Sequence, residues 1–318
     1  MKWMVTGGAG FIGSNLVDRL LAAGHEVVVY DNFSTGHREF LEGASKSDRF
    51  TLVEGDTRDE QRLPEAMAGC DIVFHFAANA DVRFGTSHPE RDLEQNTIAT
   101  FMVLEAMRKA NVKRICFSST GAIYGEATQF PTPENAEFPV QTSLYGASKL
   151  AGEGMINAYC HGFDFQSYIF RFVSITGERY NHGHVFDFYK KLQADPTRME
   201  VLGDGSAAKS YLYIQDCIDA ILLAADKATD RVNIFNLGTE THCTVNDSIS
   251  WICERLGLNP RLEYTGGKQG WVGDNSLIYL DTRRIRSLGW EPKVAINDGI
   301  VKTLDYLVDN PWLFEPGR

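Results

Sequence analysis

The sequence predicts a doubly wound α/β protein, a parallel sheet flanked by helices, with a smaller C-terminal α/β lobe that interleaves with it. Three observations lead to this fold class. Short apolar runs alternate with segments of helical period through the first half of the 318 residues. A glycine-rich turn lies between the first apolar run and the first helical segment. Another apolar run, RVNIFNLGT, returns much later and could extend the sheet.

Six apolar runs in the first 173 residues are expected to be strands: KWMVTG, HEVVVYD, FTLVEGD, DIVFHFAA, RICFSS and FQSYIFRFV. The segments between them have helical period: NLVDRLLAAG, EAMAG, TIATFMVLEAMRKAN and residues 143–160. Alternation of strand and helix at this spacing predicts parallel strands, with ligands bound at their carboxyl ends.

The domain organisation is expected to be discontinuous. Residues 1–173 and about 211–238 would form a dinucleotide-binding domain, because SYLYIQDCIDAILLAADKA restores a strand and a helix. Residues from about 174 to 210 and from 239 to 318 would form the smaller substrate-binding lobe, which ends in a helix around NDGIVKTLDYLVDN.

Composition argues against several classes of partner. The net charge is −11 and the pI is about 5.2, which disfavours a nucleic-acid surface. No apolar window approaches the roughly 20 residues of a membrane helix, and the opening MKWMVTGGAG shows no secretory signal. The six cysteines form no C-x-x-C pair. We therefore expect reduced thiols in a cytoplasmic protein, with no zinc or redox site.

The first glycine-rich turn has the pattern of a dinucleotide-binding loop. Gly8, Gly10 and Gly13 are in G-x-G-x-x-G register behind Gly7, between a strand and a helix. Asp31 ends the next strand, where a carboxylate would accept hydrogen bonds from a ribose and repel a 2′-phosphate. NAD is therefore favoured over NADP. Asp56, at the end of another strand, could meet the adenine or could be a solvated turn.

Tyr145 and Lys149 lie one helical turn apart in SLYGASKLAGEG. A phenol has a pKa of about 10, and lowering it by about three units takes roughly 4 kcal/mol of differential stabilisation. A lysine ammonium and the positive nicotinamide of NAD have the right sign of field, and Thr120 could hydrogen-bond the substrate oxygen. The alternative is that the two residues lie on an exposed helix face and have no catalytic role. Gly146 could admit a ligand, whereas Gly152 and Gly154 could allow close helix packing at a dimer seam.

Two further segments are ambiguous. Ala77 and Ala78 follow a buried strand and leave room for a flat ligand, while Arg83 could reach a diphosphate or be a rim charge. His182 and His184 suggest a metal, but no third ligand lies at a useful spacing, so we expect a substrate-lining loop and no metal.

Taken together, these motifs resemble the extended short-chain dehydrogenase/reductase family, and most closely its UDP-hexose 4-epimerases. The segments that carry the resemblance span nearly the whole chain: TGGAGFIGS, DNFSTG, HFAA, Asn96, SSTGAIYG, YGASK, RFVSITG, GDGSAAKSYLYIQD and NIFNLG. The resemblance implies a Rossmann domain with a small substrate lobe, NAD held through turnover, a UDP-sugar substrate and a homodimer. The dimer would pair through the helix at 90–109 and the helix of Tyr145.

The resemblance also implies site residues, position by position. The catalytic residues would be Thr120, Tyr145 and Lys149. The residues that would bind NAD are Gly7, Gly10, Phe11, Ile12, Gly13, Asp31, Asn32, Ser34, Thr35, Gly36, Asp56, Thr57, Phe76, Ala77, Ala78, Asn96, Ser118, Tyr145, Lys149 and Phe172. Those that would bind the substrate are Arg83, Ser119, Thr120, Tyr145, Ser174, His184, Val185, Lys209, Lys268, Gln269, Asp274 and Ile278.

In the family's 4-epimerases, the tyrosinate takes the proton of the sugar 4-hydroxyl while C4 gives a hydride to NAD. The 4-ketose then rotates about its link to the diphosphate and receives the hydride on its opposite face. The 4,6-dehydratases and decarboxylases of the family need a carboxylate just after the threonine, and here Gly121 and Ala122 follow Thr120. Epimerisation is therefore favoured. The alternatives are another nucleotide-sugar dehydrogenase, reductase or epimerase and, less favoured, a non-catalytic NAD-binding regulator.

The substrate lobe departs from the family pattern. Ser174 replaces an asparagine, Lys209 and Ser210 replace an Arg-Asp pair, and Trp271 falls where an arginine is expected. Ile278 stands where a bulky tyrosine narrows the sugar pocket of some epimerases. These departures lead to the hypothesis of a pocket that admits an N-acetylated or C6-oxidised hexose.

Overall fold

The structure, a computed structural model, describes residues 1–137, 140–267 and 277–315. At its centre lies a seven-stranded sheet in the order β11-β6-β5-β4-β1-β2-β3, in which every neighbouring pair is parallel. The strands are β1 (Lys2–Thr6), β2 (Glu26–Asp31), β3 (Phe50–Glu54), β4 (Ile72–His75), β5 (Arg114–Thr120), β6 (Gln166–Phe172) and β11 (Val232–Leu237). The predicted fold class is confirmed, and the late strand β11 does extend the sheet beside β6.

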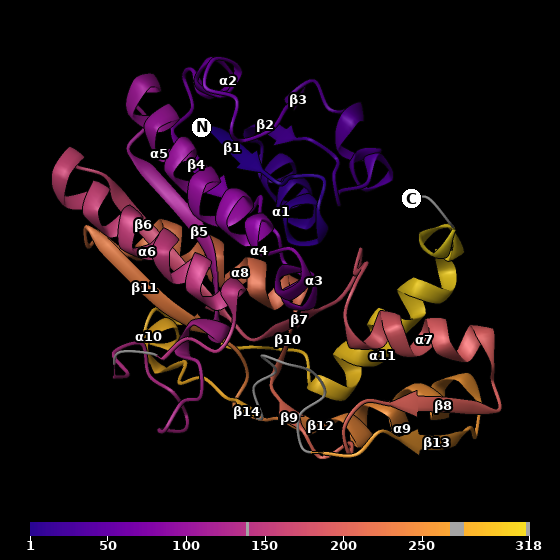
Figure 1. The fold of residues 1–318 in the computed structure, drawn as a ribbon. Helices are drawn as coiled ribbons and strands as arrows, with labels where there is room; N and C mark the ends of the chain where they lie inside the picture. The colour runs from indigo at the N-terminus through magenta and orange to yellow at the C-terminus, as the bar shows by residue number, and fades with distance from the viewer. Residues whose placement is uncertain (138–139, 268–276, 316–318) are drawn as a thin grey trace.

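Helices cover both faces of this sheet (Figure 1). One hydrophobic cluster joins the sheet to α1 and α8, and a second joins it to α2, α5 and α6. The helices are α1 (Phe11–Ala22), α2 (Arg62–Met67), α3 (Val82–Ser87), α4 (Pro89–Asp92), α5 (Ala99–Ala110), α6 (Leu144–Phe163), α7 (His184–Ala194), α8 (Ile214–Lys227), α9 (Val245–Leu256), α10 (Arg283–Arg286) and α11 (Ile296–Asp309). Short 3-10 turns are η1 (Arg38–Leu41), η2 (Ala44–Lys46), η4 (Gly121–Tyr124) and η5 (Pro311–Phe314).

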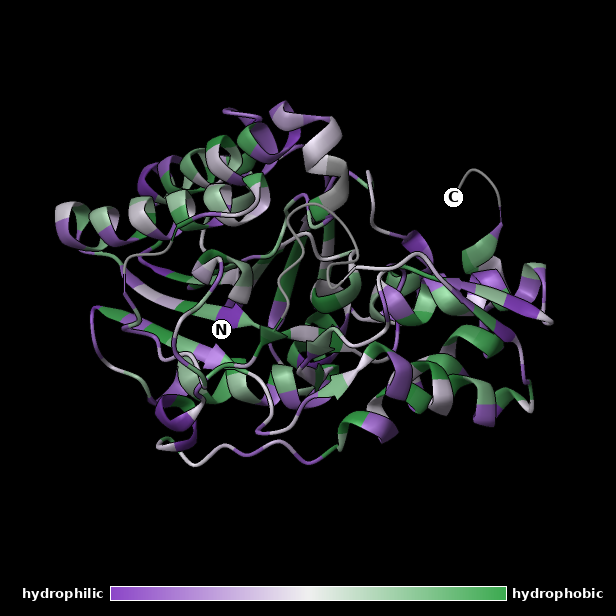
Figure 2. Cartoon of the chain, turned by 60° about the horizontal axis from the view of Figure 1, so that its bottom comes forward, coloured by the Kyte–Doolittle hydropathy of each residue, from purple (hydrophilic) through white to green (hydrophobic). Residues whose placement is uncertain are grey.

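The central strands are apolar along most of their length because both of their faces are covered. Every residue of β4 is buried, as are five of the seven residues of β5. Buried parallel strands of this kind are nearly continuous in hydrophobicity, whereas the helices around them alternate between polar and apolar residues. Figure 2 shows the alternation of hydrophilic and hydrophobic residues along the helices. In the part of the chain that the structure describes, no helix combines the length and apolar composition that a membrane span requires.

Short strands and three helices form a second group of elements, at the lower right of Figure 1. The strands are β7 (Ser174–Thr176), β8 (Arg198–Val201), β9 (Ala208–Lys209), β10 (Tyr211–Tyr213), β12 (Cys243–Thr244), β13 (Arg261–Tyr264) and β14 (Leu277–Ile278). They pair as β10-β7, β13-β8 and β12-β9-β14, and α7, α9 and α11 pack beside them. The domain boundaries expected from the sequence stay a prediction.

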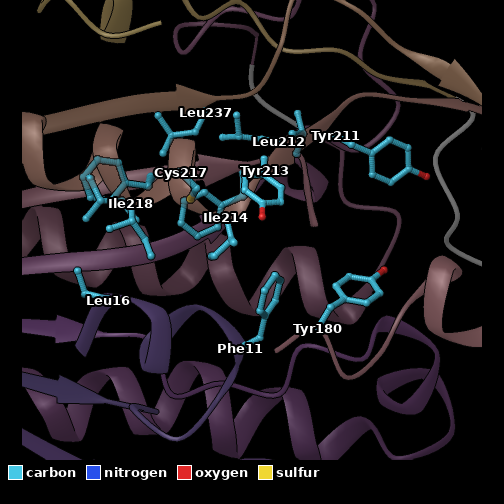
Figure 3. Close-up of a cluster of buried hydrophobic side chains, with 14 of the residues drawn as sticks. Phe11, Leu16, Tyr180, Tyr211, Leu212, Tyr213, Ile214, Cys217, Ile218 and Leu237 are labelled. Carbon is cyan, nitrogen blue, oxygen red and sulfur yellow. The ribbon is translucent and has the colours of Figure 1, made fainter. Parts of the chain in front are cut away.

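A buried cluster joins this second group to the main sheet. Figure 3 shows Phe11 at the start of α1 beside Tyr180, below the side chains of β10 and α8. The Phe11 and Tyr180 rings meet edge to face, with their centroids 5.5 Å apart. The first turn of α1 is therefore fixed against the segment that leads into α7.

The helix expected at 97–111 differs from the expectation at its start. The chain is already helical from Pro89, and α4 and α5 are joined by a π-helical turn, η3 (Leu93–Ile98). Asp92 precedes this turn and Asn96 lies within it, and both are about 1% exposed. A π-helical turn is rare and frequently marks a functional site.

Candidate active site

The glycine turn between β1 and α1 packs too closely on neighbouring backbone to accommodate side chains at Gly7 and Gly13. Gly7 has a φ of +70°, and a Cβ there would lie 2.6 Å from the backbone nitrogen of Ala77, just beyond β4. A Cβ at Gly13 would lie 2.2 Å from the Gly7 carbonyl oxygen. Gly10 is the N-cap of α1 and offers no capping side chain. Backbone N–H groups at such a helix start suit a phosphate, so these residues fit the pyrophosphate of a dinucleotide.

Asp31 lies at the carboxyl end of β2, 7% exposed. Its Oδ2 accepts from the backbone of Ala9 and its Oδ1 from that of Phe33, each at 2.8 Å. Burial raises the pKa of this carboxyl, and the two hydrogen bonds oppose the rise. Gly36 packs on Ala9, so the segment carrying Asn32, Ser34, Thr35 and Gly36 lies beside the glycine turn, as a cofactor-binding loop should.

Asp56 follows β3, and its carboxylate is bound by Arg58, with Nε to Oδ1 at 3.0 Å. The same carboxylate accepts from Asn32 at 3.2 Å. These bonds, first of all those from Arg58, hold the pKa of Asp56 below its usual value. Thr57 next to it is buried. The structure thus places Asp56 at the sheet edge by Asn32, while its contact with adenine stays a prediction.

Thr120 and Tyr145 meet at the carboxyl end of β5. The Thr120 hydroxyl accepts from the backbone of Ala122 at 3.1 Å and is hydrogen-bonded to the Tyr145 hydroxyl. Tyr145 stands in the first turn of α6, which begins at Ser143 because the Ser143 side chain accepts from the Gly146 N–H at 3.0 Å. This N-cap fixes the start of the helix and with it the position of the phenol.

Lys149, one turn further along α6, is 2% exposed. Its Nζ donates to the Ser118 carbonyl at 2.9 Å and lies 4.7 Å from the centre of the Phe117 ring. Burial lowers the pKa of Lys149 to about 7, against the attraction of Asp92 and Glu153. The predicted catalytic residues Thr120, Tyr145 and Lys149 are therefore brought together where β5 ends.

The effect on the phenol differs from the sequence-based expectation. Burial raises the pKa of Tyr145 to about 12, the Thr120 hydrogen bond opposes the rise, and the charge of Asp92 adds to it. The sequence argument considered the fields of the lysine and of the nicotinamide of NAD. It omitted desolvation, which disfavours a phenolate in a closed site. The protein groups alone do not lower this pKa.

Two other predicted cofactor residues have structural partners. Asn96 accepts from the Asn79 N–H at 2.8 Å and donates to Ser148 Oγ at 2.9 Å, so it joins the loop after β4 to α6. Ser118 supplies the carbonyl that accepts from Lys149. Phe76, Ala77 and Ala78 lie just beyond β4, and Phe172 ends β6.

Ser119 was predicted to bind substrate, but its hydroxyl is committed elsewhere. The side chain is 2% exposed and donates to Glu153 Oε1 at 2.5 Å. Glu153 is paired with Arg171 through two hydrogen bonds, Nε to Oε1 at 3.1 Å and a terminal nitrogen to Oε2 at 2.8 Å. Arg171 also donates to Tyr124 at 2.6 Å. Sequence reasoning missed this network, although Glu153 lies one helical turn beyond Lys149.

The start of α7 carries two predicted substrate residues, His184 and Val185. Their backbone N–H groups donate to the hydroxyl of Tyr180, which caps the helix and was not singled out from the sequence. The Val185 side chain is fully buried in the core, so only its backbone could face a ligand. His184 is bound to Ser248 Oγ at 2.8 Å, and burial lowers its pKa to about 3. Among the described residues, no group of three His, Cys, Asp or Glu could hold a metal ion.

The structure describes only some of the other predicted substrate residues. Ser174 and Lys209 are half-buried in β7 and β9. Ile278 lies against Gly121, where a Cβ would be 3.0 Å from Ile278 Cγ2, so it stands directly beside the end of β5. Arg83 is on α3, but its side chain lies outside the described part of the chain. Lys268, Gln269, Trp271 and Asp274 also lie outside the described residues.

Two glycines of α6, Gly146 and Gly152, have contacts that differ from those expected. A Cβ at Gly146 would lie 2.8 Å from the Ala122 carbonyl, so this glycine lets α6 approach the turn after Thr120 instead of admitting a ligand. Gly152 packs inward on Phe117 and Thr100. Nothing lies within 4 Å of a Cβ at Gly154, which alone of the three faces outward.

Comparison with known proteins identifies relatives of this chain. The model of the NAD dependent epimerase/dehydratase family matches residues 3–238. A UDP-glucose 4-epimerase of Mycolicibacterium smegmatis is 35% identical over 96% of this chain and 98% of that protein.

Two solved structures extend the comparison. A UDP-glucose 4-epimerase of Thermotoga maritima with UDP-glucose is 32% identical, has a TM-score of 0.88, and is matched over 98% of this chain and 100% of that one. A dTDP-glucose 4,6-dehydratase of Streptomyces venezuelae, solved with NAD, is 26% identical with a TM-score of 0.92 over 99% of both chains. The chain therefore belongs to the NAD dependent epimerase/dehydratase family.

Proposed function

We propose that this protein is an NAD-dependent 4-epimerase of a UDP-hexose that acts through a 4-keto sugar. The observation that carries the proposal is the meeting of Thr120, Tyr145 and Lys149 at the carboxyl end of β5. In the sheet, β5 is next to β4 and then β1, whose carboxyl ends hold Ala77 and the glycine turn. A sugar reacting at C4 would therefore lie between the base and the cofactor.

Each residue has a distinct task in this proposal. Tyr145 takes the proton of the 4-hydroxyl, and Thr120 holds the same oxygen. NAD, held by the glycine turn and Asp31, would supply a reversible hydride acceptor for C4 and the positive charge of its nicotinamide. Since burial raises the pKa of Tyr145 to about 12, the phenolate needs positive charge nearby. Lys149 supplies one charge from within the protein.

The turn after Thr120 supports epimerisation over dehydration. Gly121 offers no carboxylate, and a Cβ there would lie 3.0 Å from Ile278 Cγ2 and 3.3 Å from the Phe172 carbonyl oxygen. An acidic side chain at this position would have to displace its neighbours. The retained Tyr145 and Lys149 favour an enzyme over an NAD-binding regulator.

The proposed substrate range follows from Ile278. This side chain is smaller than tyrosine and stands beside the end of β5. We infer a sugar pocket that admits an N-acetylated or C6-oxidised UDP-hexose as well as UDP-glucose and UDP-galactose. Lys209, half-buried in β9, would meet the diphosphate as a point charge.

The proposed assembly is a homodimer through α5 and α6. Leu93, Ile98 and Phe101 are 54%, 40% and 43% exposed along the π-helical turn and α5. Gly154 on the neighbouring helix α6 has open space before it. An apolar row beside an open glycine suits packing against a second copy. The six cysteines are all free and buried, which agrees with the cytoplasmic location that we propose.

The proposal is tested by incubating the purified protein with UDP-glucose, UDP-N-acetylglucosamine or UDP-glucuronate without added NAD. Proton NMR of H4 then follows the configuration at C4. We expect 4-epimers from at least one donor. Steady release of NADH once NAD is added would instead favour a net dehydrogenase, and no product, even with NAD added, would favour a regulator.

A further inference from the structure

Four buried charged side chains lie on α6 or beside it. They are Asp92, Lys149, Glu153 and Arg171, which are 1%, 2%, 2% and 7% exposed. Buried charges are costly unless each is balanced. The set contains two cations and two anions. The question is which of the two carboxylates balances the charge of Lys149.

Glu153 is already paired. Both of its carboxylate oxygens accept from Arg171, and Oε1 also accepts from Ser119. A bidentate guanidinium–carboxylate pair matches one charge with another in fixed geometry. The negative charge left for Lys149 is that of Asp92.

Asp92 is held facing α6 by two amides. Its Oδ1 accepts from Asn79 Nδ2 at 2.8 Å and from Asn96 Nδ2 at 3.2 Å. Asn96 Nδ2 also lies 2.9 Å from the hydroxyl of Ser148, which directly precedes Lys149. The link therefore runs from the Asp92 carboxylate to the backbone position next to the lysine.

The second oxygen of Asp92 has no hydrogen-bond partner among the described residues, although it is buried. Gly85 closes its other side, because a Cβ at that position would lie 1.9 Å from Oδ2. An unpaired buried oxygen costs free energy unless a nearby charge compensates for it. The π-helical turn that follows Asp92 sets this residue and Asn96 on the side of α6.

We propose that Asp92 is a positioning residue: its carboxylate is the counter-charge that keeps the buried Lys149 ammonium protonated, and Lys149 in turn supports the Tyr145 phenolate. This inference rests on the proposed function for the role of Tyr145, but the action of the Asp92 charge on Lys149 is testable without catalysis.

The charges around Lys149 agree with this assignment. Burial lowers the pKa of Lys149 to about 7, and Asp92 is the first of two carboxylates that oppose the fall, before Glu153. Burial raises the pKa of Asp92, and Lys149 opposes that rise. From β4, His75 faces the same ammonium, and burial with the lysine charge lowers the pKa of that imidazole to about 3, so it stays neutral. Arg171 acts from β6 through Glu153.

Asp92→Asn removes the charge and keeps the size and the Oδ1 acceptor. The matched control is Glu94→Gln on the same turn, whose carboxylate instead pairs with Arg58 at 2.7 Å. The lysine ε-carbons of the purified enzyme, with the cofactor it carries, are titrated by carbon-13 NMR, and the Lys149 signal is assigned with Lys149→Met. We expect the Lys149 midpoint to fall by about one pH unit or more in Asp92→Asn and to stay unchanged in Glu94→Gln.

The pH profile of kcat gives the second readout. Because the charged lysine is needed, the pH above which kcat declines should move down in Asp92→Asn, with KM changed less than about twofold. An unchanged Lys149 midpoint in a folded variant would overturn the proposal. A shift confined to the acidic limb would also overturn it, because Asp92 would then act on Tyr145 directly. Asp92→Ser, also uncharged, replaces Asp92→Asn if that variant fails to fold. A wild-type enzyme that does not epimerise would refute the function, while the NMR midpoints would still decide whether the Asp92 charge acts on Lys149.

Discussion

Lys149 donates to the carbonyl of Ser118 at 2.9 Å, so the cation of the proposed active site is fixed to the strand that ends in Thr120. A lysine anchored in this way cannot swing toward solvent to recover its hydration. Its charge acts on the site from one place, and the geometry of α6 against β5 determines the field that Tyr145 experiences.

Removal of the proposed base should separate chemistry from cofactor binding. We expect Tyr145→Phe to lower kcat by about 10²–10⁴-fold, as is typical for loss of a general base. NAD released on denaturation should be the same as from the wild type, because the glycine turn and Asp31 that would hold the dinucleotide are unchanged. Turnover at the wild-type rate in this variant would remove Tyr145 from the mechanism.

The width of the sugar pocket is tested at Ile278. Ile278→Tyr should lower kcat/KM for UDP-N-acetylglucosamine by at least about tenfold relative to UDP-glucose, because the larger ring would fill space beside Gly121. Both donors are assayed by NMR in the same mixture. If the wild type converts only unsubstituted UDP-glucose and UDP-galactose, the hypothesis of a roomy pocket is wrong.

The sequence predicted the strands of the main sheet because each is an apolar run bounded by polar or glycine residues. It also predicted the proximity of Thr120, Tyr145 and Lys149 from helical period and strand order. It did not predict the Tyr180 cap of α7 or the pairing of Glu153 with Arg171. Tyr180 is close in sequence to the helix that it caps, but tyrosine is not among the usual capping residues. Glu153 and Arg171 are 18 residues apart on a helix and a strand, and no local pattern specifies their pairing. The π-helical turn at 93–98 was missed because its sequence has ordinary helical composition.

The proposed dimer is tested by Phe101→Glu. A charge within the exposed apolar row of α5 should shift the protein to the monomer, measured by light scattering after size exclusion. Val308→Glu is the matched control, because Val308 is also 43% exposed but lies on α11 in the second group of elements. A dimer in both variants, or a wild-type monomer, would contradict the assignment of this face.

Two glycines of α6 should respond in opposite directions to alanine. Gly146→Ala would bring a methyl group to 2.8 Å from the Ala122 carbonyl, and we expect it to lower the free energy of unfolding by about 1–3 kcal/mol. Gly162→Ala meets nothing within 4 Å and should raise that free energy by about 0.5–1 kcal/mol. Urea unfolding measures both. Equal effects would show that helix propensity alone governs these positions.

Acid should destabilise the fold through His75 and His184, because burial lowers the pKa of each to about 3. Below pH 6.5 the two imidazoles bind protons in the unfolded chain but stay neutral in the folded protein. The free energy of unfolding therefore falls as the pH drops from 6.5 toward 3. Each histidine should add about 1.4 kcal/mol per pH unit to this loss. His184→Gln should reduce the slope between pH 6 and 4, measured by urea unfolding. The exposed His161→Gln serves as control, and a reduction there of equal size would contradict the assignment.

The pairing of β7 with β10 limits how a substrate can enter. The chain leaves the main sheet after β6 and comes back toward it before α8, and these two crossings are hydrogen-bonded to each other as parallel strands (Figure 1). A hinge needs a few unconstrained backbone bonds where the moving part is attached. Here the two attachments are hydrogen-bonded to each other and cannot bend independently, so a rotation of the second group of elements would have to displace both at once. Access to Tyr145 is therefore expected through displacement of loops, with the two parts held in constant orientation through a catalytic cycle.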